Sequence, residues 1–108
     1  DQLQKDLEAV TTAGAFGVVL EGIIEPVARQ LLINASIPLI GIGASVSCHG
    51  QILVTDDLIG LYADFTPKFV KKYANVQDII QKAAQAYSED VISLKFPDKS
   101  HCFWPDKK

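Results

Sequence analysis

One carboxylate in this chain stands where a general base could work. Glu21 follows residues 16–20, which are all apolar or glycine. This run is too apolar to alternate and therefore predicts a strand buried on both faces of a parallel sheet. The carboxyl ends of such strands form the ligand-binding edge, where desolvation raises the pKa of a carboxyl group towards neutrality. Glu21 is thus a candidate catalytic base; the alternative is a helix N-cap or a surface ion-pair partner for a nearby Lys or Arg.

Small residues end a second apolar run, residues 37–44, and form a second candidate site. Gly41, Gly43, Ala44 and Ser45 would let a ligand approach the backbone and would offer N–H groups to an anion. The pattern lacks the third glycine and the following helix of a dinucleotide-binding loop. Packing of the glycines against neighbouring strands is the alternative interpretation.

Two charged clusters could bind ligands, but each also has a purely structural explanation. Asp56 and Asp57 could bind a divalent cation, but such a pair more often caps a helix or a turn. Lys68, Lys71 and Lys72 could hold an anion, but lysines grouped in this way usually form a solvated face.

The two cysteines each have a histidine beside them, Cys48-His49 and His101-Cys102. These four side chains could bind zinc tetrahedrally, although adjacent ligands are not the usual spacing of a zinc site. The chain shows no secretory feature, and we expect free thiols in loops rather than a disulfide.

Helices and strands alternate in the predicted element order. We expect a helix over 2–13 with Asp1 as N-cap and Gly14 as its stop, a strand over 15–21, a helix opening at Glu25-Pro26, a strand over 37–44 and a polar loop over 45–50. Residues 51–54 predict a short third strand, although so short an apolar run could equally be helical, and helices are expected over 67–73 and 76–94. The last helix carries an apolar stripe at spacings of three and four, which predicts core or a subunit interface: Val76, Ile80, Ala83, Tyr87, Val91 and Leu94. This order indicates an α/β fold, either a βα barrel or a doubly wound sheet.

Composition narrows the classes of function. The chain has 108 residues and a net charge of −3. It therefore lacks the excess of basic residues with which proteins bind the phosphates of a nucleic acid, which makes nucleic acid an unexpected partner. It has no apolar run near the roughly 20 residues of a membrane span. It has no Met, even at position 1, and its two or three parallel strands cannot close a barrel. We therefore expect a piece of a longer protein, with further strands completing the fold.

Several segments together resemble the ketopantoate hydroxymethyltransferase (3-methyl-2-oxobutanoate hydroxymethyltransferase) family. The matching segments are VVLEGI at 18–23, IPLIGIGA at 37–44, GQILV at 50–54, DLIGL at 57–61 and PKFVKKYA at 67–74, with the ending Phe96-Pro97, His101 and Phe103. They occur in order over nearly the whole chain. The resemblance implies the C-terminal part of a TIM barrel of the phosphoenolpyruvate/pyruvate-binding type. Residues 1–108 would supply about strands six to eight and the C-terminal helices, and the N-terminal strands would be missing.

The resemblance also implies the activity of a cytoplasmic transferase of pantothenate biosynthesis. That activity moves a hydroxymethyl group from 5,10-methylenetetrahydrofolate to 3-methyl-2-oxobutanoate and gives 2-dehydropantoate. Glu21 matches the family's general base, and Gly41, Gly43, Ala44 and Ser45 would help wall the substrate and folate pocket. A Mg²⁺ ion would be bound by residues on earlier strands, with no ligand in this chain. Partners would be the 2-oxo acid, folate and further copies in a homo-oligomer, and this chain alone should be inactive.

Departures from the family pattern keep two other readings open. The family usually has Gly where this chain has Ser45, Asp where it has His49, His where it has Asp56, and Pro where it has Ile24. These changes cluster around the expected pocket rim. A non-catalytic relative that acts as an assembly module is one alternative, and a superfamily enzyme acting on another 2-oxo acid is the other.

Overall fold

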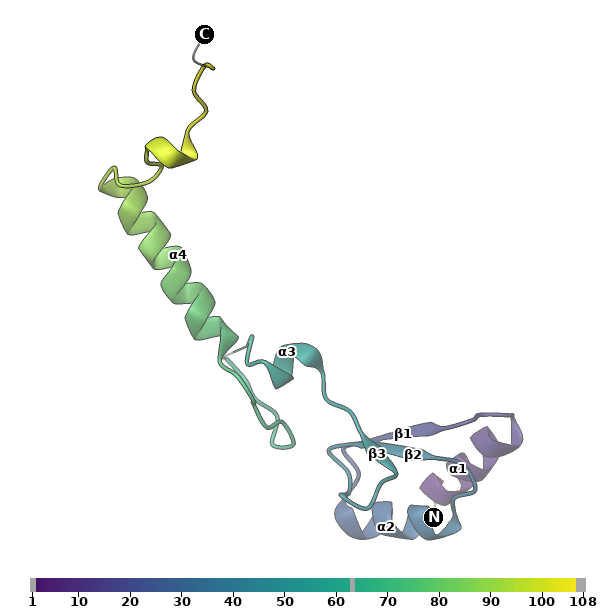
Figure 1. Cartoon of the computed structure of the whole chain (residues 1–108). Coiled ribbons are helices and arrows are strands. Elements are labelled where there is room, and N and C mark those ends of the chain that lie inside the picture. The colour runs from purple at the N-terminus through teal and green to yellow at the C-terminus, as the bar shows by residue number, and fades with distance from the viewer. Residues whose placement is uncertain (1, 63, 107–108) are drawn as a thin grey trace.

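The chain folds as an α/β unit at one end and a projecting helical segment at the other (Figure 1). A computed structural model describes residues 2–62 and 64–106. In chain order the elements are α1 (Gln2–Thr12), β1 (Val18–Glu21), α2 (Glu25–Asn34), β2 (Leu39–Ile42), β3 (Gly50–Gln51), α3 (Thr55–Leu58), α4 (Val76–Ile92) and the 3₁₀ helix η1 (Lys99–His101). This order confirms the predicted α/β class.

The three strands form one parallel sheet in the order β1-β2-β3. Val18 pairs with Leu39 and Glu21 with Ile42, so β1 and β2 end at the same edge. The strands are shorter than the apolar runs that predicted them. The third lies at 50–51 instead of 51–54, because the segment after Gln51 leaves the sheet and leads into α3.

Helices α1 and α2 cover the same face of the sheet, and the core lies between them and the strands (Figure 1). Leu20 and Leu39 point into this core, and Leu39 has no exposed surface. On the opposite face Val19 is 52% exposed and Glu21 is exposed too. The prediction of burial on both faces is therefore not met within this chain, because the described residues cover one face only.

The ends of the first two helices follow the expected local chemistry. Helix α1 ends at Thr12, just before Gly14, and the N–H of Gly14 donates to the Thr11 carbonyl at 3.0 Å. Pro26 stands in the first turn of α2, where its missing N–H costs no hydrogen bond. The predicted N-cap Asp1 lies outside the described residues.

Backbone hydrogen bonds attach the start of α4 to α3. Tyr73 and Val76 donate to the carbonyls of Leu58 and Ile59 at 2.8 and 2.9 Å. A Cβ on Gly60 would lie 2.3 Å from the Ala74 carbonyl oxygen, and Gly60 has a φ of +68°. Only glycine fits between these two segments without strain.

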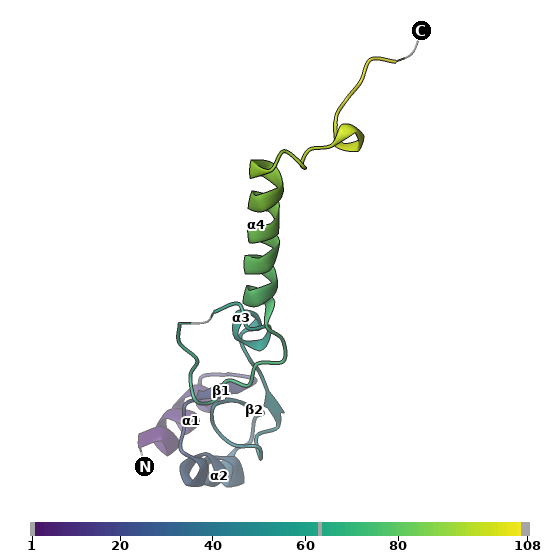
Figure 2. The same cartoon turned by 90° about the vertical axis from the view of Figure 1, so that its left-hand side faces the viewer.

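Helix α4 then projects away from the sheet, as both views show (Figures 1 and 2). The radius of gyration is 24.3 Å, against about 13 Å for a compact domain of this length. Ile80 and Tyr87, on the predicted apolar stripe, are 52% and 60% exposed, so the stripe forms no core within the described residues. No helix in the part of the chain described is both long and apolar enough to cross a membrane.

The predicted helix over 67–73 is wrong. This segment is an irregular loop with one turn, in which Val70 donates to the Pro67 carbonyl at 3.0 Å. A short helix is only marginally stable unless one of its faces packs against the rest of the protein. Here only the Phe69 side chain reaches the sheet, where it lies over Gly43.

Candidate functional site

A cavity of about 650 Å³ opens at the carboxyl ends of β1 and β2. Its walls come from the loop after β1, the loop after β2, the end of β3 and the loop between α3 and α4. The lining residues are 22–24, 43–46, 51, 68 and 69. The volume lies within the roughly 300–1,000 Å³ typical of ligand pockets.

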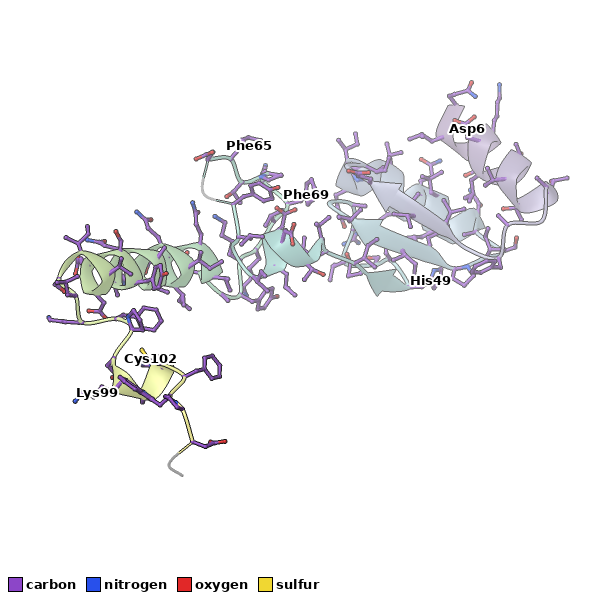
Figure 3. All side chains as sticks on the ribbon, turned by 90° about the horizontal axis from the view of Figure 1, so that it is seen from above. Asp6, His49, Phe65, Phe69, Lys99 and Cys102 are labelled. Atoms are coloured by element: carbon purple, nitrogen blue, oxygen red, sulfur yellow. The ribbon has the colours of Figure 1, made fainter. Side chains whose placement is uncertain are left out.

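Phe69 closes one side of this cavity by lying over Gly43. A Cβ on Gly43 would come within 2.7 Å of the Phe69 ring, and Gly43 has a φ of +63°. The ring lies between the sheet and α3 (Figure 3). The small residue at the strand end therefore admits a side chain from a distant loop, and that side chain becomes a wall of the cavity.

Ser45 ties the loop after β2 to the first turn of α2. Its hydroxyl donates to Glu25 Oε1 at 3.0 Å and accepts from the Ser47 N–H at 3.1 Å. Its carbonyl accepts from Gln51 Nε2 at 2.7 Å. The residue is only 3% exposed, and its hydroxyl and carbonyl are both paired, so this part of the cavity wall is held to α2 and to Gln51.

Glu25 shares its carboxylate oxygen between Ser45 and Arg29. The Arg29 Nε–H donates to Oε1 at 2.7 Å. This bond first, and the Ser45 hydroxyl second, hold the pKa of Glu25 below its ordinary value of 4.5. The carboxylate behind the cavity wall is therefore ionised and already neutralised at pH 7.

Glu21 ends β1 at the same edge but does not line this cavity; its neighbour Gly22 does. Because Leu20 points into the core, strand alternation puts Glu21 on the uncovered face of the sheet. Its side chain is exposed. The apolar enclosure expected around this carboxylate is not supplied by the described residues.

The predicted pocket residues divide into two groups. Gly43, Ala44 and Ser45 line the cavity, whereas Gly41 lies within β2, with Cys48 Sγ and Gln51 Oε1 each 3.0 Å from where its Cβ would be. Sequence reasoning did not assign Gln51, Lys68 or Phe69 to the pocket. The lysine cluster was the one signal for Lys68, and it was interpreted as a solvated face.

The three clustered lysines have different surroundings. Lys71 places its ammonium 5.0 Å from the centre of the Tyr73 ring. Lys72 Nζ donates to the Tyr62 carbonyl at 3.0 Å. Lys68 lines the cavity, and it makes no hydrogen bond or ion pair with any residue in the ranges 2–62 and 64–106. It is the only charged side chain among the lining residues.

The predicted acidic pair does not form a metal site or a cap. Asp56 and Asp57 lie in the first turn of α3, where a negative charge interacts favourably with the helix dipole, but neither side chain caps the helix. This corrects the prediction of a cap, since Val54 holds that position.

The two cysteine–histidine pairs are far apart. Figure 3 shows His49 beside the sheet and Cys102 in the C-terminal segment. His49 Nδ1 accepts a hydrogen bond from the Leu39 N–H at 3.0 Å, so this ring nitrogen is occupied by a backbone group of β2. Both thiols are free, with Cys48 buried and Cys102 exposed. Within the described ranges, no group of three or more His, Cys, Asp or Glu could hold a metal ion.

Comparison with known proteins gives one family. The family model described as ketopantoate hydroxymethyltransferase matches residues 1–99. A 3-methyl-2-oxobutanoate hydroxymethyltransferase from Paramagnetospirillum magneticum is 54% identical over all 108 residues, which cover 39% of that protein. Proteins of the same name from Brucella canis and Rhizobium rhizogenes are 47% and 46% identical over 94% and 99% of this chain, and over 37% and 39% of their own lengths. The chain thus spans about two-fifths of the length of these curated relatives.

Proposed function

The chain belongs to the ketopantoate hydroxymethyltransferase family, and on that premise we propose that it is the part of such an enzyme that carries the general base. The reaction would transfer a hydroxymethyl group from 5,10-methylenetetrahydrofolate to 3-methyl-2-oxobutanoate and give 2-dehydropantoate. The observation that carries this proposal is the family match, which spans both the strand ending in Glu21 and the loops around the cavity.

The proposed fold of the whole enzyme is a TIM barrel, to which this chain contributes the C-terminal strands and helices. Two features support it. Both helices that flank β1 and β2 cover the same face of the sheet, whereas a doubly wound sheet has helices on both faces. The uncovered face carries Val19 and Glu21, and it would become the barrel interior once further strands closed the ring.

The edge of β1, unpaired within the described residues, also supports the proposal that a further strand lies beside it in the whole enzyme. Val18 donates to the carbonyl of Pro38, just before β2, and Gly22 donates to the carbonyl of Ile42 in β2, at 3.0 Å each. In a parallel pair the N–H groups alternate in direction, so those of Val19 and Glu21 point away from β2. A further strand at this edge would pair with them and bring more side chains around the Glu21 carboxylate.

In the proposed reaction Glu21 takes the proton from C3 of the keto acid. One water enters and tetrahydrofolate leaves: water takes the one-carbon unit from the folate nitrogens at the oxidation level of formaldehyde, as its C–N bonds break. The electron pair from the C3–H bond forms the new C–C bond to that carbon, while the C=O π pair moves to the oxygen, which takes up a proton and becomes the hydroxyl of the hydroxymethyl group. A carboxylate suits this step when it is shielded from water, because desolvation raises its basicity. We attribute that shielding to residues outside this chain, in agreement with the exposure of Glu21 here.

A Mg²⁺ ion that binds the keto acid is implied by the family resemblance. The described residues do not fit it, because they contain no cluster of three metal-ligating side chains. The ion would therefore be held by residues outside this chain. Assembly into a homo-oligomer is likewise proposed from the resemblance.

The test is proton-to-deuterium exchange at C3 of 3-methyl-2-oxobutanoate, followed by NMR, in the whole polypeptide in which these residues occur. We expect exchange in the native protein and a loss of at least about a hundredfold in Glu21→Gln. Gln2→Glu, remote from the sheet edge, serves as the control for a changed carboxylate. Unchanged exchange in Glu21→Gln would refute the assignment of the base.

A further inference from the structure

Lys68 supplies a positive charge at the rim of the cavity and forms no ion pair with any of the described residues. None of the ten lining residues is acidic. The nearest carboxylate in the hydrogen-bond network of the wall, that of Glu25, is already bonded to Arg29 and Ser45. An anion entering the cavity would therefore meet one unopposed ammonium group.

The other lining residues carry no charge. Ser45 and Gln51 are polar, Ile23, Ile24, Val46 and Phe69 are the large apolar side chains, and the remaining lining residues are Gly22, Gly43 and Ala44. Phe69 offers an aromatic ring, held over Gly43, on which a flat ring could stack. Such a site fits a ligand with an aromatic body and an anionic end.

The size of the cavity distinguishes between the two substrates of the proposed reaction. A five-carbon keto acid would occupy only a small part of about 650 Å³. A folate, with its two ring systems and its glutamate, would occupy much more. Both molecules carry carboxylates, so a carboxylate is the chemistry that Lys68 would recognise in either case.

We infer that Lys68 binds a carboxylate of the glutamate end of the folate co-substrate, whose rings lie against Phe69 and the Ile23-Ile24 wall. This inference rests on the proposed function and adds to it a residue that determines folate affinity. Lys71 and Lys72 have no such role, because their ammonium groups are engaged by the Tyr73 ring and the Tyr62 carbonyl.

The experiment measures ligand binding by isothermal titration calorimetry in the whole polypeptide. The probes are folic acid, the neutral methylamide of pteroic acid, which lacks the glutamate, and 3-methyl-2-oxobutanoate. The variants are Lys68→Gln and, as the matched control, Lys72→Gln. We expect Lys68→Gln to weaken folic acid about two- to fivefold, the range of an exposed ion pair, and to leave the methylamide and the keto acid unchanged. Lys72→Gln should change none of the three.

Every other outcome of the binding measurements overturns the inference. Equal weakening of folic acid and the methylamide would assign Lys68 a structural role, and weakening of the keto acid alone would assign it to that carboxylate. No binding of folic acid, or binding that is indifferent to Lys68, would remove the site altogether. Product formation in the native protein is measured in parallel. If 2-dehydropantoate forms while Lys68→Gln binds folic acid normally, only this inference fails; if folic acid binds through Lys68 and no product forms, only the proposed function fails.

Discussion

Replacing Gly43 with alanine tests whether the Phe69 ring lies over the strand end. The new Cβ would come within 2.7 Å of the ring, and alanine would have to keep a φ of +63°. Gly22 is the matched control, because its φ is +61° and nothing lies within 4 Å of its Cβ position. The two substitutions share the backbone strain and differ in the contact.

The magnitudes follow from these two contributions. A non-glycine residue in the left-handed region costs about 1–2 kcal/mol. Full burial of a Phe side chain contributes about 1.5–3 kcal/mol; Phe69 is 40% exposed, so displacing it would cost roughly 1–2 kcal/mol. We expect Gly22→Ala to cost about 1–2 kcal/mol and Gly43→Ala about 2–4 kcal/mol.

Amide hydrogen exchange provides the assay, since it reports local opening free energies. The N–H groups of residue 22, His49 and Ile52 all donate to β2 carbonyls, at 3.0, 2.9 and 3.0 Å. Phe69→Ala provides a second background, in which Gly43→Ala should cost no more than Gly22→Ala. The reasoning is refuted if Gly43→Ala costs the same with and without the Phe69 ring.

Two further predictions concern the core and the Glu25 carboxylate. Leu39→Ala should lower the unfolding free energy by about 2–5 kcal/mol, because Leu39 is fully buried. The control Val46→Ala, at an 85% exposed site, should change it by less than about 0.5 kcal/mol. Chemical denaturation followed by circular dichroism measures both, and equal effects would contradict the described core. Glu25 should titrate by NMR below its ordinary pKa of 4.5, and Arg29→Gln should raise the midpoint more than Ser45→Ala does. Because the folded-state pKa is lowered, the stability that Glu25 contributes is present above its unfolded pKa and is lost as the pH falls through the folded value; a midpoint at or above 4.5 would contradict the two hydrogen bonds.

Local sequence signals predicted the elements whose stabilising contacts are close in sequence. The spacing of Val76, Ile80 and Tyr87 predicted α4, which forms over Val76–Ile92. Pro26 and Gly14 marked helix boundaries correctly, because they act through their own backbone. The same kind of signal failed at residues 67–73, where helical spacing was present and no surface was available for the helix to pack on.

The cavity shows where sequence reasoning ends. Gly43, Ala44 and Ser45 were predicted from the end of an apolar run, which is a local feature. Phe69 and Lys68 reach the cavity only because the loop after α3 folds back onto Gly43, and the bonds that fasten the two ends of this loop to α3 are between backbone groups. Backbone hydrogen bonds do not depend on the type of side chain, so the sequence alone could not predict this wall of the cavity.

The loop over residues 61–72 is fastened at both ends through main-chain groups. Leu61 donates to the Asp56 carbonyl and Tyr73 to the Leu58 carbonyl, each at 2.8 Å. Between these two points the loop can change in sequence, and at little entropic cost in length, without moving α3 or α4. Descendants of this gene can therefore diverge at an exposed wall position such as Lys68 while inheriting the same scaffold, whereas a change of Phe69, which packs over Gly43, would alter ligand preference and folding stability together.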